Sequence, residues 1–103
     1  MDFYLSTPAE ILHTLGVRLR EQRLAQSLTQ RDLAHMAGLS LGALRKLESN
    51  GQCSLETLVR AAQALGLLEA LEGLFALKRQ SIAQMEQIDV VSRRQRAPRK
   101  KTS

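Results

Sequence analysis

The sequence predicts an all-α domain of five helices, and three observations support this fold class. Aromatic residues make up only 3% of the 103 residues and tryptophan is absent, so leucine and alanine must fill the interior. Residues that cap helix N-termini precede four leucine-rich stretches, at Thr7, Thr29, Ser40 and Ser54. The leucines in these stretches recur every three or four residues, which is the spacing of one helical face. A chain of this length forms one small domain with a modest core.

The first helix is expected to begin at Pro8, behind an N-terminal segment of residues 1–7. Thr7 serves as its N-cap with Glu10 three residues on, and proline is favoured at the first helical position. Ser27 is expected to end this helix. The leucines predicted for its buried stripe are Leu12, Leu15 and Leu19.

The N-terminal segment carries Phe3, Tyr4 and Leu5, which include two of the three aromatic residues. Two interpretations remain open. The segment folds back over the first helix as a plug, or it docks on a second subunit or another protein.

Residues 29–51, TQRDLAHMAGLSLGALRKLESNG, predict two short helices joined by a tight turn. Thr29 and Ser40 cap the two helices. Gly38 lies where the chain must reverse, and Gly51 ends the second helix. The residues expected to point inward are Leu33, Ala34, Ala37, Leu44 and Leu47. Two helices packed in this way form a helix-turn-helix unit, which offers its second helix to the major groove of DNA.

The segments LTQRDLA, AGLS and LRKLESNG resemble the helix-turn-helix of Cro and lambda-repressor type bacterial and phage regulators, across residues 16–75. The resemblance implies a compact five-helix, lambda-repressor-like domain and a double-stranded operator DNA partner. It also implies that Arg23 pairs with Glu48 and turns its guanidinium toward a phosphate.

Candidate DNA contacts lie at the start of the two motif helices. Gln30 can present its amide and its backbone N–H to a phosphate, and Ser40 can do the same at the start of the second motif helix. The resemblance places base contacts on the following turns, where Leu41 can pack on a thymine methyl and Gly42 allows close approach. Arg45 is the best candidate for a bidentate guanine contact. The full predicted DNA-binding set is Gln30, Arg31, Ser40, Leu41, Gly42, Arg45, Lys46 and Arg23.

A fourth helix is predicted from its cap at Ser54 to Gly66, and a fifth helical segment over Leu67 to Leu77. The fifth segment holds more apolar surface than one helix face needs in so small a domain. We therefore expect a homodimer that uses this surplus. The residues predicted for the dimer contact are Leu67, Leu71, Leu74 and Phe75. The helix-turn-helix domain is predicted to span residues 8–77.

The C-terminal residues are predicted to leave the helical domain. Residues 78–92 are predicted to form an arm or a short strand, in which residues 78–87 either extend the fifth helix or form a loose arm and residues 88–91 have β-branched character. Such a strand would pair across a dimer, pair with another protein, or stay unformed. Residues 93–103 carry six Arg and Lys and no acid, and predict a disordered basic tail.

Composition excludes several classes of function. The net charge of +5 and the basic residues around the motif suit a phosphate partner. His13 and His35 lack ligands at metal-binding spacing, and Cys53 has no base beside it, so we expect no catalysis, metal or cofactor. No apolar run is long enough for a membrane span, and the sequence has no signal-peptide pattern. The prediction is a cytoplasmic, nucleoid-associated bacterial protein.

The single compact domain, the aromatic N-terminal segment and the RRQR-type tail resemble HipB-like proteins. These are the DNA-binding members of toxin–antitoxin modules whose toxin is a HipA-like kinase. The resemblance implies a dimeric repressor that autoregulates its operon and binds the toxin or a toxin–antitoxin complex. Two alternatives stay open, namely an antitoxin that neutralises the kinase by contact and a stand-alone phage-type regulator.

Overall fold

The computed structural model describes residues 2–78 and residue 90. Within them the chain forms five α-helices and one short 3-10 helix, and no strand. These elements are η1 (Phe3–Leu5), α1 (Pro8–Ala25), α2 (Gln30–Ala37), α3 (Leu41–Asn50), α4 (Leu55–Ala64) and α5 (Leu68–Glu72). The prediction of an all-α, five-helix domain is confirmed. The predicted tail, residues 93–103, lies outside the described residues. Of the predicted arm or strand, residues 78–92, only Lys78 and Val90 are described, and Val90 is helical.

The predicted helix starts are present at all four capping residues. Thr7 and Thr29 each form a complete capping box, in which the hydroxyl accepts from the third helical N–H while Glu10 or Asp32 accepts from the backbone N–H of the cap. Ser40 accepts a hydrogen bond from the backbone N–H of Ala43 at 3.1 Å. Ser54 caps α4 in the same way. The sequence therefore determines locally where these helices begin.

Two helices, α2 and α3, end directly at a glycine with left-handed backbone. Gly38 has φ +67° between α2 and α3, and Gly51 has φ +75° after α3, as the sequence predicts. Ser27 ends the turn after α1 with φ +57°, although it carries a side chain. An L-residue is less favourable than glycine in this conformation, so this turn contains a small local strain.

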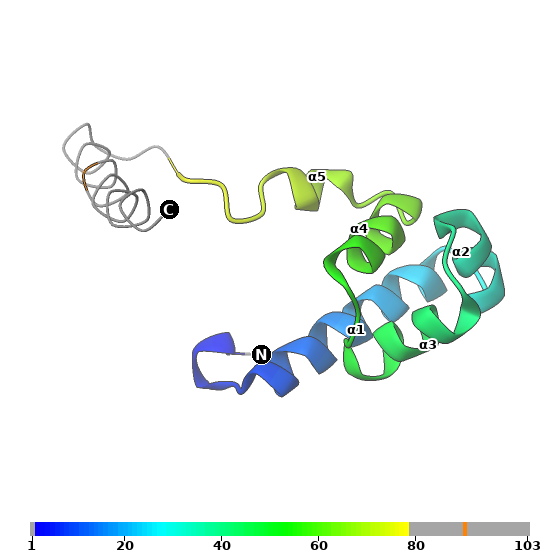
Figure 1. The fold of residues 1–103 in the computed structure, drawn as a ribbon, viewed down its shortest axis with the longest axis horizontal. Helices are drawn as coiled ribbons and strands as arrows, with labels where there is room; N and C mark the ends of the chain where they lie inside the picture. The colour runs from blue at the N-terminus through cyan, green and yellow to red at the C-terminus, as the bar shows by residue number, and fades with distance from the viewer. Residues whose placement is uncertain (1, 79–89, 91–103) are drawn as a thin grey trace, which may run out of the picture.

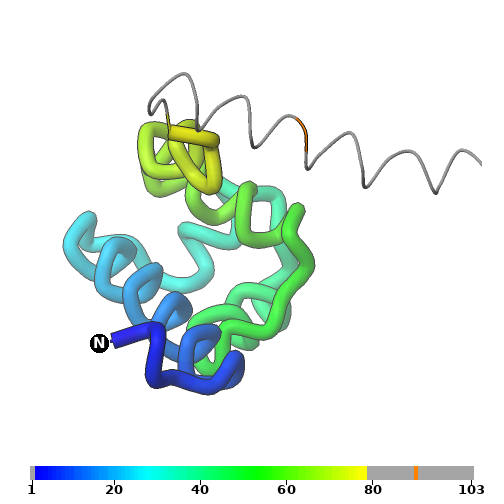
Figure 2. Tube along the Cα trace, turned by 90° about the vertical axis from the view of Figure 1, so that its left-hand side faces the viewer, coloured from blue at the N-terminus to red at the C-terminus, as the bar shows by residue number. Residues whose placement is uncertain are grey.

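The core lies between α1, α2, α3 and α4. Leu33, Leu44 and Leu47 are its largest fully buried side chains, and Leu19, Ala34, Ala61 and Leu65 complete the cluster. In Figure 1, α1 runs alongside α3, while α2 and α4 close the other sides of the core. The view turned by 90° in Figure 2 also shows α5 at the far end of the domain from α3.

Two glycines permit the close approach of α1 to α3. A Cβ atom at Gly16 would clash with the carbonyl oxygen of Leu47, and one at Gly51 would clash with the backbone of Leu12. The face of α1 turned to α3 therefore runs through Gly16, Leu19 and Arg23, which are buried. This corrects the predicted stripe, because Leu15 is only half-buried and Leu12 is 40% exposed.

The fifth helix is shorter than predicted. It ends at Glu72, where Gly73 is its C-cap, and the chain continues through turns in which Phe75 has φ +59°. Glycine is a poor helix former, so it stops a helix that has few packing contacts to extend it. The apolar residues after Gly73 consequently lie on turns and not on a continuous helical face.

The N-terminal segment contacts the first helix through one of its three large apolar side chains, Phe3. Asp2 caps η1 by accepting from the N–H of Tyr4 at 2.9 Å. The ring of Phe3 lies against α1, with the Arg18 guanidinium 5.2 Å from its centroid. Tyr4 and Leu5, in contrast, are 100% and 86% exposed. Phe3 thus anchors the segment to α1, while its two neighbours face solvent.

Candidate nucleic-acid interface

The helix-turn-helix exposes basic side chains on α3 and at the start of α2. Arg45 and Lys46 on α3 are exposed, as is Arg31 on α2. The helix cap explains this arrangement, since Ser40 starts α3 at a point where Leu44 and Leu47 turn into the core. The charged neighbours of these leucines must then face outward.

The first turn of α3 leaves room for a close partner. Gly42 is exposed, and a Cβ atom built on it would meet no atom of the described chain within 4 Å. Leu41 is half-buried and Ser40 is exposed beside it. The first-turn N–H groups of a helix have no intrahelical acceptor, apart from the one that Ser40 satisfies. A backbone phosphate or a base edge can therefore approach this turn closely.

A buried ion pair holds the motif to α1. Arg23 donates through Nε to Oε2 of Glu48 at 2.8 Å and through Nη2 to Oε1 at 2.9 Å. Both residues are buried, at 6% and 4% exposure. The hydrogen bond to Glu48 raises the pKa of Arg23 above its already high ordinary value, against the opposing effect of burial. The predicted Arg23–Glu48 pair is confirmed.

The same geometry argues against a phosphate contact by Arg23. Its third donor, Nη1, points to the carbonyl oxygen of Leu28 at 2.7 Å, in the turn that leads into α2. Three N–H groups of the guanidinium thus donate to acceptors inside the domain, and the bond to Leu28 fixes the α1–α2 turn. Burial leaves the guanidinium little surface for the phosphate contact that the resemblance implies, and that contact stays a prediction.

Gln30, the first residue of α2, has a contact that the sequence did not predict. Its Nε2 donates to Oε1 of Glu48 at 3.1 Å, and the side chain is half-buried. A half-buried amide next to a buried carboxylate is visible only in the folded chain, since the two residues are 18 positions apart. No local sequence pattern predicts this hydrogen bond.

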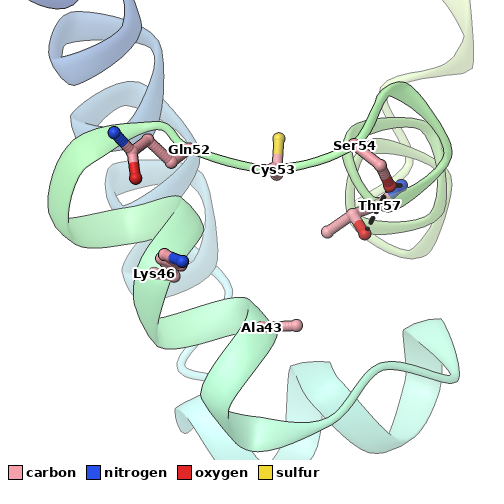
Figure 3. Close-up of a pocket in the computed structure, with 6 residues that line it drawn as sticks. All are labelled: Ala43, Lys46, Gln52, Cys53, Ser54 and Thr57. Atoms are coloured by element: carbon pink, nitrogen blue, oxygen red, sulfur yellow. Dashed lines mark hydrogen bonds between the residues drawn. The ribbon is translucent and has the colours of Figure 1, made fainter.

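A shallow depression of about 360 Å³ lies between α3 and the start of α4 (Figure 3). Ala43 and Lys46 line it from α3, and Cys53 lies in the segment that connects the two helices. Ser54 donates to the hydroxyl of Thr57 at its far edge. Partial burial raises the pKa of the Cys53 thiol, although the residue is exposed overall.

The other candidate polar residues do not converge on a reaction centre. The Nδ1 atom of His13 lies 3.1 Å from the carbonyl oxygen of Ser49, and His35 is exposed on α2. Among the described residues, no group of His, Cys, Asp and Glu could hold a metal ion. No helix in that part of the chain combines the length and apolarity that a membrane crossing requires.

The residues predicted for a dimer contact lie at and beyond α5. Leu67 and Leu71 are half-buried, whereas Leu74 and Phe75 are 48% and 92% exposed. Leu68 and Leu77 add to the exposed apolar area. This patch, Leu67–Leu77, lies at the far end of the domain from α3, so it does not cover the basic side chains of α3 (Figure 1).

Comparisons with known proteins agree with this description. A family model described as helix-turn-helix matches residues 19–71. Among solved structures, the chain is similar to the restriction-modification controller protein C.AhdI from Aeromonas hydrophila, with 34% sequence identity and a TM-score of 0.53. That match covers 56% of this chain and 89% of the controller protein. No curated protein matches the chain.

Proposed function

Because the chain belongs to the helix-turn-helix family of DNA-binding transcriptional regulators, we propose that it works as a homodimeric repressor that binds double-stranded operator DNA. The observation that carries this proposal is the exposed, basic and sterically open α3. Arg45 and Lys46 project from it, and Gly42 leaves its first turn bare. A positively charged helix with an open N-terminal turn suits the major groove. In the bacterial cytoplasm, the nucleoid would supply its target.

Each predicted contact residue has a distinct proposed role. Ser40 and Gln30 begin the two helices and hold backbone phosphates there. Arg45 reads a guanine through its planar fork, and Leu41 and Gly42 let the helix approach the base edges. Lys46 and Arg31 supply charge to phosphates. Arg23 positions the motif.

The dimer is proposed from the apolar patch Leu67–Leu77. Exposed leucines and a 92% exposed phenylalanine cost solubility in a monomer, and a second copy would cover them. A two-fold dimer presents two α3 helices to two half-sites, which is how small helix-turn-helix domains reach useful affinity. We propose residues 8–77 as the folded unit of this dimer.

Two kinds of operon are proposed as targets. The aromatic N-terminal segment and the basic tail resemble HipB-like repressors of toxin–antitoxin operons, whose partner is a HipA-like kinase. The exposed pair Tyr4 and Leu5 supports this candidate, because it offers a protein partner an apolar contact. In that role the chain is a repressor or an antitoxin that acts by contact. The 34% identity to a restriction-modification controller protein supports control of restriction–modification genes as the second candidate.

The proposal is tested by binding the purified chain to the DNA immediately upstream of its own gene. We expect a discrete complex that survives excess scrambled duplex and that lowers transcription in vitro. The neighbouring gene separates the two candidates, since a kinase reading frame supports the first and an endonuclease or methyltransferase the second. Equal affinity for upstream and scrambled DNA would contradict a sequence-specific repressor.

A further inference from the structure

One buried carboxylate joins the three helices that support the DNA-facing surface. Glu48 lies in the last turn of α3 and is 4% exposed. It accepts two hydrogen bonds from Arg23 of α1 and a third from Gln30 of α2, whose Nε2 lies 3.1 Å from Oε1. The Arg23 pair accounts for the fold. The bond to Gln30 reaches a residue at the start of α2, where a helix offers N–H groups to anions.

The chemistry of this contact fixes the orientation of an amide. An ionised carboxylate beside a buried guanidinium accepts hydrogen bonds and donates none. The Gln30 side chain must therefore turn its NH₂ group, and not its carbonyl oxygen, toward Glu48. One N–H is then used by Glu48, and the second N–H is left for another acceptor near the start of α2.

Arg23 fixes the position of the Glu48 carboxylate relative to the start of α2. While its Nε and Nη2 hold Glu48, its Nη1 holds the carbonyl oxygen of Leu28 at 2.7 Å. Leu28 precedes the cap of α2 by one residue and Gln30 by two. One guanidinium therefore holds both the Glu48 carboxylate and the turn before α2, and this fixes the distance between them. Gln30 has little freedom to turn its amide over.

We propose that Glu48 is a positioning residue for DNA binding, which fixes the Gln30 amide so that its second N–H donates to a backbone phosphate. This inference rests on the proposed function and adds a defined role for a residue that DNA cannot touch. With Glu48 in place, the α2 N-terminus offers a phosphate both main-chain and side-chain donors. With the amide reversed, its carbonyl oxygen would face the phosphate and repel it.

A double-mutant cycle on DNA binding tests this role. Glu48→Gln has similar volume, but its own amide can donate or accept, so Gln30 is no longer held in one orientation. Gln30→Met keeps the length of the side chain and removes the amide. We expect Glu48→Gln to weaken binding about tenfold in the wild-type background, and less than about twofold when Gln30→Met is present. Glu56→Gln removes a carboxylate that pairs with Arg60 at the surface, and serves as the control for charge.

The amide protons of Gln30 give a second measurement that needs no DNA and no substitution. In the free wild-type chain, NMR should find one Gln30 Hε2 proton protected from exchange with solvent and the other unprotected. Two freely exchanging protons would overturn the proposal, even if Glu48→Gln fails to fold. Equal weakening by Glu48→Gln in both backgrounds would also overturn it and leave the proposed function intact. A wild-type chain that binds no duplex would overturn the proposed function, and this inference with it.

Discussion

At the scale of single residues, the two adjacent cations of α3 are expected to differ in what they recognise. Arg45 and Lys46 are both exposed, but arginine presents a planar fork whereas lysine is a mobile point charge. We predict that Arg45→Ala costs about 1–3 kcal/mol on the preferred duplex and little on random DNA. Lys46→Ala should weaken both more evenly. Binding titrations at matched salt distinguish the two roles. Equal losses of affinity on both duplexes for Arg45→Ala would show that Arg45 does not read a base.

Substitution of Gly42 should change the stability of the fold and the affinity for DNA in opposite directions. An alanine Cβ there meets no atom of the described chain within 4 Å, so Gly42→Ala should raise the free energy of unfolding by about 0.4–1 kcal/mol. If the first turn of α3 approaches DNA closely, the same methyl group should weaken DNA binding. Chemical denaturation and binding titrations measure the two effects separately. A more stable variant with unchanged affinity would show that DNA does not approach this turn.

Some of the residue contacts in this fold can be predicted from the sequence and others cannot. The caps, the left-handed glycines and the Arg23–Glu48 pair are all predictable, because each depends on a short spacing or a family pattern. The Gln30–Glu48 bond and the exposure of Leu12 are not. The exposure of Leu12 depends on how closely α1 approaches α3, and the Gln30–Glu48 bond depends on how α2 packs against α3.

At the scale of elements, the capping boxes make helix stability depend on pH. Hydrogen bonds from the backbone and hydroxyl of Thr7 and Thr29 lower the pKa of Glu10 and of Asp32 below the ordinary values of 4.5 and 3.8. A lowered folded pKa means that this stability is present above the ordinary pKa and is lost as pH falls through the folded value. Acidification from about pH 6 to about pH 2 should therefore lower Tm more in wild type than in the double variant Glu10→Gln, Asp32→Asn. Parallel Tm curves would contradict the role of these carboxylates.

The elements differ in how well the sequence predicts them. α2 and α3 have strong start and stop signals, so their boundaries follow from Thr29, Gly38, Ser40 and Gly51. α5 has no side-chain cap and few packing contacts, and glycine ends it at Gly73. A leucine count indicates an apolar surface there but not its conformation.

At the scale of the whole molecule, the proposed homodimer forms through the patch Leu67–Leu77. Leu71→Glu should give monomers in light scattering and weaken DNA binding, because a buried charge disrupts an apolar contact. Phe75→Glu should do the same without touching the core, since Phe75 is 92% exposed. Leu24→Glu, at a 52% exposed position on α1, is the control that should stay dimeric. Dimers that persist in both patch variants would contradict this assignment.

The central claim is that two α3 helices, held in a two-fold dimer, read a DNA sequence. Selection of the wild-type chain on a pool of random duplexes, followed by sequencing, tests it most directly. We expect enrichment of a two-fold symmetric site whose half-sites lie about one helical turn, 10–10.5 base pairs, apart, with a guanine in each half-site that Arg45→Ala no longer selects. A pool that remains random, or a site without two-fold symmetry, would contradict it.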